Sequence, residues 1–504
     1  MDFRKIAREN TISIIVYIAL LCFFTFLAMN KYTCSNENFL IGIFILVLVL
    51  GVILIFYFRG NMKNIYKVAF VVILIFGICS VFLTPICDIS DEYEHLVRSE
   101  IVSNGEITTD YVKDPVNNLS GFKTISSMEA LCIATDSNLF EHQLWDTKIN
   151  YTDYYSSCAF AQNPFYAYIA PALGILLAEF LNLSTVWMLF LGRMANLILY
   201  AVIVSIAIKK APAFKFPLFL VSIFPLSIFQ AGSISSDCFF ICFAILAIAY
   251  FFVLYKSDNI RYRDLGVFFG SILLLSILKQ PYVVLSLLIF VVPNSNFKDV
   301  KQNVISKITI IAVIGVVVLW TSYAAPQLNN SWRLVYFMDK HVDPSEQAKF
   351  MLSNPSFDLY YVYKVLTLTP VISDRLFEFS YAKQAYSAPL VSTIYLVFII
   401  IFSLFYPLKE KFSVLNRFKV FIIGVIIYYG MFIVQYLTWI PVKSKHFADG
   451  VPGRYFIPLL VLIPLIINIS YKTNFNKKTF SNIAFAVAIS FVGGMLMLTT
   501  VAKF

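Results

Sequence analysis

The sequence has little charge and almost no histidine. Only 13% of its 504 residues are Asp, Glu, Lys or Arg, and only four are His. A soluble domain carries about a quarter charged residues, so this shortage excludes an ordinary soluble enzyme. Apolar residues take their place: 59% of the chain is hydrophobic, and 50 residues are Phe. The composition is typical of a membrane protein surrounded by a lipid bilayer.

The sequence also lacks the motifs of several enzyme classes. It contains no Gly-rich phosphate-binding loop, no zinc motif and no Ser-His-Asp signature. The eight Cys are scattered without a CxxC pair, and Cys132 and Cys158 could form a disulfide only in an oxidising compartment. We therefore expect no bound cofactor, although acidic loops could recruit Mg²⁺ or Ca²⁺.

Apolar runs long enough to cross a bilayer recur along the whole chain, and residues 39–58 carry no charge at all. These runs predict an all-α polytopic membrane protein with about 13 transmembrane helices and two large extracytoplasmic loops. The expected spans lie near residues 10–29, 39–58, 68–86, 185–208, 216–232, 238–255, 265–279, 281–293, 308–324, 388–406, 420–441, 456–471 and 480–501.

The loops divide the chain into four parts. Residues 1–67 would form two accessory helices, and 68–324 a membrane core that includes the first outer loop, 87–184. The second outer loop would cover 325–387, followed by C-terminal membrane helices over 388–504. Loops of this length commonly carry function, so we expect the site there.

Basic residues indicate the orientation. With the N-terminus in the cytoplasm, short cytoplasmic segments hold more than half of the 39 basic residues and few acids. This asymmetry follows the positive-inside rule, and it explains the net charge of +10 without a nucleic-acid partner. A bacterial inner membrane is the expected location. Residues 165–183 must then lie along the outer interface, with Tyr166 and Tyr168 at headgroup depth.

Carboxylates are concentrated at the start of the first outer loop, between residues 88 and 94. On a helix, Asp91, His95 and Arg98 would share one face, with Glu92 beside them. A carboxylate kept ionised by neighbouring cations can act as general base toward a sugar hydroxyl. The same acids could instead cap the beginning of a helix.

Polar residues also interrupt later apolar runs. Asp237 lies between two predicted spans, where an acid either faces a protein cavity or caps the next helix. Lys279 and Gln280 break an apolar stretch, and Arg454 begins a late span at its outer end. A cation there could bind a lipid phosphate, or it could snorkel to the interface. Arg193, within the fourth span, could pair with an acid of the first loop.

A series of short motifs runs through the chain in a recognisable order. Its members are Asp91, Glu92, His95 and Arg98; Gln162 to Tyr166; Gly192, Arg193 and Asn196; Ser233, Ser235 and Asp237; Lys279, Pro281 and Tyr282; Asp343, Pro344, Gln347, Asn354 and Pro355; and Gly453 to Pro458. The series resembles the GT-C superfamily of integral-membrane glycosyltransferases, and within it a bacterial polytopic family classed as a domain of unknown function. One departure is that Pro85 stands six residues before Asp91, where the family has a double proline next to the acids.

The resemblance implies a GT-C-like fold and an inverting transfer from a polyprenyl-phosphate sugar to an envelope glycan acceptor. The acceptor could be an O-antigen, a teichoic acid or a wall polysaccharide. Asp91 would be the catalytic base, with Glu92 as its partner or substitute and Asp88 as a further candidate. The implied substrate-binding residues are His95, Arg98, Tyr166, Arg193, Asp237, Lys279, Gln280, Arg454 and Tyr455. A lipid-linked glycan polymerase or ligase, a transporter or flippase, and a non-catalytic scaffold are the alternatives.

Overall fold

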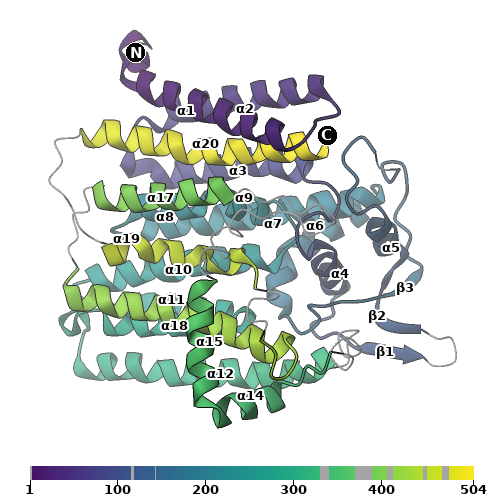
Figure 1. Cartoon of the computed structure of the whole chain (residues 1–504), viewed down its shortest axis with the longest axis vertical. Helices are drawn as coiled ribbons and strands as arrows, with labels where there is room; N and C mark the ends of the chain where they lie inside the picture. The colour runs from purple at the N-terminus through teal and green to yellow at the C-terminus, as the bar shows by residue number, and fades with distance from the viewer. Residues whose placement is uncertain are drawn as a thin grey trace.

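The membrane helices lie side by side in one bundle, and a small sheet with short helices gathers at one end of it (Figure 1). In this computed structural model, α1 starts at the opposite end and α20 ends on the same side as the sheet. The structure describes residues 3–114, 119–141, 143–329, 340–368, 389–405, 412–445, 451–467 and 476–504.

Within those ranges, eight helices are long and apolar enough to cross a membrane. They are α1 (Phe3–Lys31), α2 (Glu37–Phe58), α3 (Ile65–Leu83), α7 (Thr185–Lys210), α10 (Ser236–Lys256), α12 (Val300–Asn329), α18 (Val414–Trp439) and α20 (Lys477–Lys503). The apolar side chains of Ile41, Ile45 and Ile53 on α2 are more than half exposed, as expected for a surface that contacts lipid. The fold is mostly helical, while the count of thirteen spans stays a prediction.

Several predicted spans are built from shorter pieces. Residues 216–232 form α8 (Lys215–Ser222) and α9 (Pro225–Ala231), and 456–471 begin as the 3₁₀ helix η5 (Gly453–Val461), followed by α19 (Leu462–Ile467). The predicted break at Lys279 is present: α11 (Tyr262–Leu278) ends there, and η3 (Gln280–Phe290) follows. Proline accounts for these interruptions, since Pro225, Pro281 and Pro458 lack the N–H that a continuous α-helix requires.

The all-α expectation is corrected by the loop predicted to be the first outer loop, because it contains a three-stranded antiparallel sheet in the order β1-β2-β3. Phe122 of β2 lies opposite Tyr111 of β1 and Ser156 of β3. Gly121 has a φ of 151° and packs so tightly on the Ser156 backbone that a Cβ would come within 2.8 Å of it. The loop's elements are α4 (Glu92–Ser103), β1 (Tyr111–Asp114), β2 (Leu119–Ile125), α5 (Ser126–Ile133) and β3 (Asp153–Ser156).

Residues 165–183 form the short helices η2 (Phe165–Tyr168) and α6 (Ile169–Phe180), which are too short to span a bilayer. Helix α6 packs on α7. None of the eight cysteines, all of which lie in the described ranges, forms a disulfide bond, so Cys132 and Cys158 are not joined to each other. The remaining described elements are η1 (Met62–Asn64), η4 (Asn294–Asn296), α14 (Pro344–Ser353), α15 (Pro355–Thr367) and α17 (Pro389–Phe405). Of the predicted second loop, residues 330–339 and 369–387 lie outside the described part.

Candidate active site

A tight turn connects α3 to α4 and presents Asp91. Pro85 follows the end of α3 and prevents the helix from continuing. Cys87 and Asp91 then take the left-handed conformation, with φ of 51° and 67°, which costs an L residue on the order of 1 kcal/mol. Asp91 is the N-cap residue of α4, and Glu92 and Glu94 lie in its first turn, as the helix-cap interpretation expected, but the Asp91 side chain makes no capping hydrogen bond to the helix. Its carboxylate is available for another contact.

That contact is with Arg454, at the start of η5. The Nη2 of Arg454 donates to Asp91 Oδ2 at 2.7 Å, and its Nε donates to Asp237 Oδ2 at 2.5 Å. Asp237 lies in the first turn of α10 and is buried, whereas the Asp91 side chain is 30% exposed. One guanidinium therefore joins two carboxylates that come from distant parts of the chain.

A second cation completes this cluster. Lys279, at the break between α11 and η3, places its Nζ 3.4 Å from Asp237 Oδ1 and 3.8 Å from the centre of the Tyr455 ring. The carbonyl of Tyr455 accepts a hydrogen bond of 2.6 Å from Tyr282 Oη, which fixes η5 against η3. We refer to Asp91, Asp237, Lys279 and Arg454 as the open cluster, because the carboxylate of Asp91 reaches solvent.

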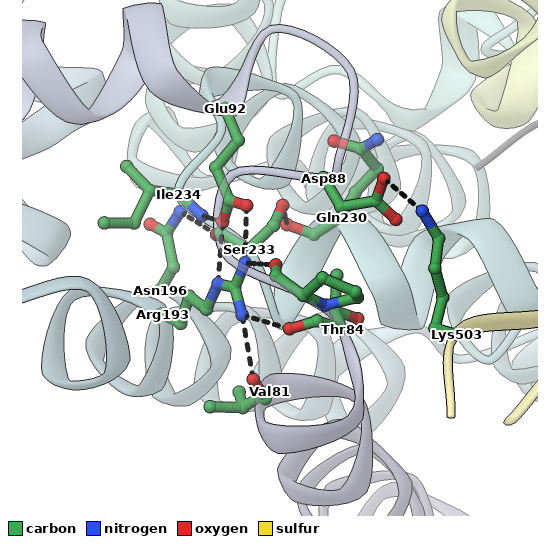
Figure 2. Close-up of polar contacts among 11 residues, drawn as sticks. Val81, Thr84, Asp88, Glu92, Arg193, Asn196, Gln230, Ser233, Ile234 and Lys503 are labelled. Atoms are coloured by element: carbon green, nitrogen blue, oxygen red, sulfur yellow. Dashed lines mark hydrogen bonds and ion pairs between the residues drawn. The ribbon is translucent and has the colours of Figure 1, made fainter. Parts of the chain in front are cut away.

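Glu92 turns into a different ion pair, with Arg193 of α7. Arg193 Nε and Nη2 donate to the two carboxylate oxygens at 2.8 and 2.6 Å, and both side chains are completely buried. The other N–H groups of Arg193 donate to the carbonyls of Val81, Thr84 and Pro85 at 2.7–2.9 Å (Figure 2). Glu92 also accepts a bond of 2.9 Å from the backbone N–H of Ile234.

All five guanidinium N–H groups of Arg193 are therefore used. We refer to Glu92 and Arg193, with the carbonyls they hold, as the closed clamp. Because it is buried and saturated, it offers no group to a substrate. Glu92 therefore stabilises the turn between α3 and α4. It pairs with Arg193, whereas the neighbouring Asp91 pairs with Arg454.

Further along α4, His95 and Arg98 are held by the rings of Phe160 and Tyr168, which we refer to as the aromatic support. His95 Nδ1 lies 2.8 Å from Tyr168 Oη, and its ring stacks on Phe160 with centroids 4.0 Å apart. Burial lowers the pKa of His95 to about 3, which keeps the imidazole neutral near pH 7. Arg98 is also buried and donates to the carbonyls of Ile107 at 2.8 Å and Asn163 at 3.3 Å.

A family model described as a predicted membrane protein, DUF2142, matches residues 74–463, which is more than half of the chain. The chain belongs to the DUF2142 family. No curated protein and no solved structure matches it. The DUF2142 region contains every residue of the open cluster and of the closed clamp, whereas α1, α2 and α20 lie outside it.

Within the DUF2142 region, the structure brings together four of the residues predicted from sequence, which are the open cluster itself. The ring of Tyr455 contacts Lys279 and so lies beside the open cluster. Gln280, the residue after Lys279, is half-buried. Tyr166 has a different contact: its hydroxyl donates a hydrogen bond of 2.8 Å to the carbonyl of Leu274 and so connects η2 to α11. Glu92 and Arg193 pair with each other, and His95 and Arg98 lie in the aromatic support.

The described acids of this DUF2142 protein do not fit a metal site. In the part of the chain that the structure describes, no group of three or more His, Cys, Asp or Glu could hold an ion. The carboxylates of the open cluster are paired with Arg454 and Lys279 instead. His142 and His446 lie outside the described residues.

Sequence reasoning missed Lys503, at the end of α20. Its Nζ lies 3.0 Å from both Asp88 Oδ1 and Asp136 Oδ1. The sequence could have indicated it, because this lysine ends the last predicted span on the side that the positive-inside rule predicts to be extracytoplasmic, where basic residues are scarce. Asp88 is therefore held by a cation of its own and is not part of the open cluster.

An apolar groove of about 260 Å³ lies between the end of α4 and α6. Its lining includes Ile107, Phe165, Ile169 and Leu173. Ile169 and Leu173 also belong to the exposed apolar surface of α6. The groove therefore suits a hydrocarbon chain at the edge of the bundle.

Proposed function

We propose that the protein is a membrane glycosyltransferase that moves a sugar from a polyprenyl-phosphate donor to a cell-envelope glycan. The observation that carries the proposal is the open cluster, in which a partly exposed carboxylate, Asp91, lies 2.7 Å from a cation that a second, buried carboxylate holds in place. A base and an anion-binding group are thus adjacent, as a transfer from a phosphate leaving group requires.

The cations suit the phosphate of the donor. Arg454 presents a planar guanidinium, which recognises phosphate oxygens well, and Lys279 adds a second positive charge on the other side of Asp237. A polyprenyl-phosphate sugar is confined to the membrane, so its phosphate would be found at the ends of the membrane helices. The apolar groove beside α6 offers a surface for part of the hydrocarbon chain.

In the reaction we propose, Asp91 accepts the proton of the acceptor hydroxyl. The hydroxyl oxygen attacks C1 of the sugar, and the bond between C1 and the phosphate oxygen breaks with inversion at C1. Polyprenyl phosphate leaves with the bonding electron pair, and Arg454 and Lys279 stabilise its charge. A positioned general base of this kind contributes roughly 10²- to 10⁴-fold to the rate.

The proposal includes the wider assignments that the resemblance implies: a GT-C fold, a bacterial inner membrane, a cytoplasmic N-terminus and a site on the outer face. This orientation needs the N-terminus and the site on opposite sides of the membrane, and it is supported by the start of α1 at the end of the bundle opposite the sheet (Figure 1). An acceptor glycan approaching from the aqueous side would reach the exposed part of Asp91 first.

The test is a transfer assay with the purified protein in liposomes that contain a polyprenyl-phosphate sugar. We expect release of polyprenyl phosphate that depends on an envelope-glycan acceptor, and a product linkage of inverted anomeric configuration. Transfer of whole glycans from a lipid carrier would identify a polymerase or ligase instead. Movement of the lipid-linked sugar between leaflets without bond cleavage would identify a flippase, and either result would contradict the proposal.

A further inference from the structure

We propose that Lys503 is a positioning residue for Asp91, so that the end of α20 fixes the turn that presents Asp91 to Arg454. The catalytic consequence rests on the proposed transferase function, whereas the positioning of the turn does not. The proposal gives a role in the site to a helix that lies outside the DUF2142 match.

The contacts of Lys503 reach into the first outer loop at two points. Its Nζ lies 3.0 Å from Asp88 Oδ1 (Figure 2) and 3.0 Å from Asp136 Oδ1. The Asp88 side chain is completely buried. The backbone carbonyl of Lys503 also accepts a bond of 2.8 Å from Asn138 Nδ2. A buried carboxylate that loses its cation is costly, so Asp88 depends on Lys503 to remain where it is.

The turn is thereby held on both sides of Asp91. On the α7 side, Arg193 binds the carbonyls of Thr84 and Pro85 together with the carboxylate of Glu92. On the α20 side, Lys503 holds Asp88. Between these two anchors the backbone carries the unfavourable positive φ of Asp91, which persists only where its surroundings enforce it.

Helix α20 is itself anchored firmly enough to act as a fixed point. It packs against α1, α2 and α3. Gly494 allows the closest approach, since a Cβ there would lie 2.6 Å from the ring of Phe24 on α1. The ring of Phe491 lies against the ring of Phe24 in a tilted arrangement, with the centroids 4.9 Å apart. The accessory helices α1 and α2 therefore act on the open cluster through Lys503.

The first readout needs no substrate. Cys87 adjoins Asp88 in the turn and is only 7% exposed, so its reaction with N-ethylmaleimide reports opening of the turn. Peptide mass spectrometry resolves this thiol from the other cysteines in the full-length protein. We expect Lys503→Met to speed the reaction about 10-fold, because local opening governs access to a buried group. Lys503→Arg should restore the slow rate, and Lys478→Met, at the other end of α20, should leave it unchanged.

The second readout is the transfer reaction. Displacement of Asp91 should lower kcat about 10-fold in Lys503→Met, since small misplacements of a catalytic group have effects of this size or more. The KM for the polyprenyl-phosphate sugar should stay unchanged, because Arg454 and Lys279 remain in place. A general loss of packing would not lower kcat while leaving KM unchanged and also be rescued by Lys503→Arg.

The outcomes separate the two hypotheses. Faster labelling of Cys87 in Lys503→Met supports the positioning role even if the wild-type protein transfers no sugar, a result that would refute only the proposed function. Unchanged labelling of Cys87 in folded Lys503→Met overturns the positioning role. If Lys503→Met does not accumulate, the charge-balanced double variant Asp88→Asn/Lys503→Met replaces it, with the same expectation and the same contrary result.

Discussion

Asp91 and Glu92 are neighbours in the sequence, yet they enter two ion-pair clusters of opposite character. In the closed clamp, Glu92 and Arg193 are completely buried, and every N–H group of Arg193 has an acceptor. In the open cluster, Asp91 is 30% exposed, and Arg454 reaches two carboxylates with Nε and Nη2. The clamp fixes the backbone, and the open cluster presents charged groups at a surface.

The difference shows how the same pair of residue types can serve structure or chemistry. A buried ion pair is retained only when hydrogen bonds compensate the loss of water, and the closed clamp meets that condition in full. A cluster that binds a ligand must leave some hydrogen-bonding and charged groups available for that ligand. We therefore expect changes in the clamp to affect mainly folding, and changes in the open cluster to affect mainly transfer.

The largest effect on stability should come from Arg193→Met. This variant leaves Glu92 buried without its cation, which costs about 3–5 kcal/mol of unfolding free energy. Thermal unfolding in detergent would show a large fall in Tm or a protein that does not accumulate. The double variant Glu92→Gln/Arg193→Met removes both charges and should recover most of the loss. An unchanged Tm for Arg193→Met alone would contradict the structural role that we assign to the closed clamp.

A smaller effect on stability, with a clear effect on transfer, is expected for Arg454→Lys. The variant keeps the charge but cannot bridge Asp91 and Asp237 with two directed N–H groups. We expect kcat to fall about 10-fold or more, and the unfolding free energy to fall by about 1 kcal/mol. Arg261→Lys is the matched control, because Arg261 pairs with Asp264 while its side chain is 66% exposed. Equal kinetics in the two variants would argue against a role for Arg454 in the reaction.

The last prediction concerns how stability depends on pH, and it is made for His95→Gln. Because burial lowers the pKa of His95 to about 3, the unfolded chain binds a proton that the folded chain does not between that value and about pH 6.5. Wild-type stability should therefore fall with decreasing pH, with a contribution from His95 of up to about 1.4 kcal/mol per pH unit. The variant lacks this contribution, so unfolding curves measured from about pH 7 to 4.5 should converge. Parallel curves would show that His95 titrates in the folded protein.

Part of this arrangement could be predicted from the sequence. A lysine, a glutamine and a proline inside an apolar run predicted the break at Lys279, and the structure has it there. The positive-inside pattern placed Asp91, Asp237 and Arg454 at the same end of their helices, and they meet there. These predictions succeeded because the cost of polar groups in a membrane limits where they can lie.

Other features depend on tertiary structure that local patterns do not encode. The divergence of Asp91 from Glu92 follows from a single positive φ at Asp91 and from the position of Arg193, more than a hundred residues away. The three-stranded sheet was missed because its strands are short and only their mutual pairing stabilises them. Lys503 contacts Asp88 across 415 positions of sequence, a distance over which periodicity carries no information.

The rate at which purified Asp91→Asn releases polyprenyl phosphate, relative to wild type at equal amounts of folded protein, tests the central claim most directly. Asparagine preserves the size of the side chain and cannot accept the proton as a carboxylate does. We predict a fall of about 10²-fold or more, with Tm nearly unchanged because Asp237 still holds Arg454. Release at the wild-type rate by the folded variant would show that Asp91 is not the base and that the open cluster does not perform the transfer.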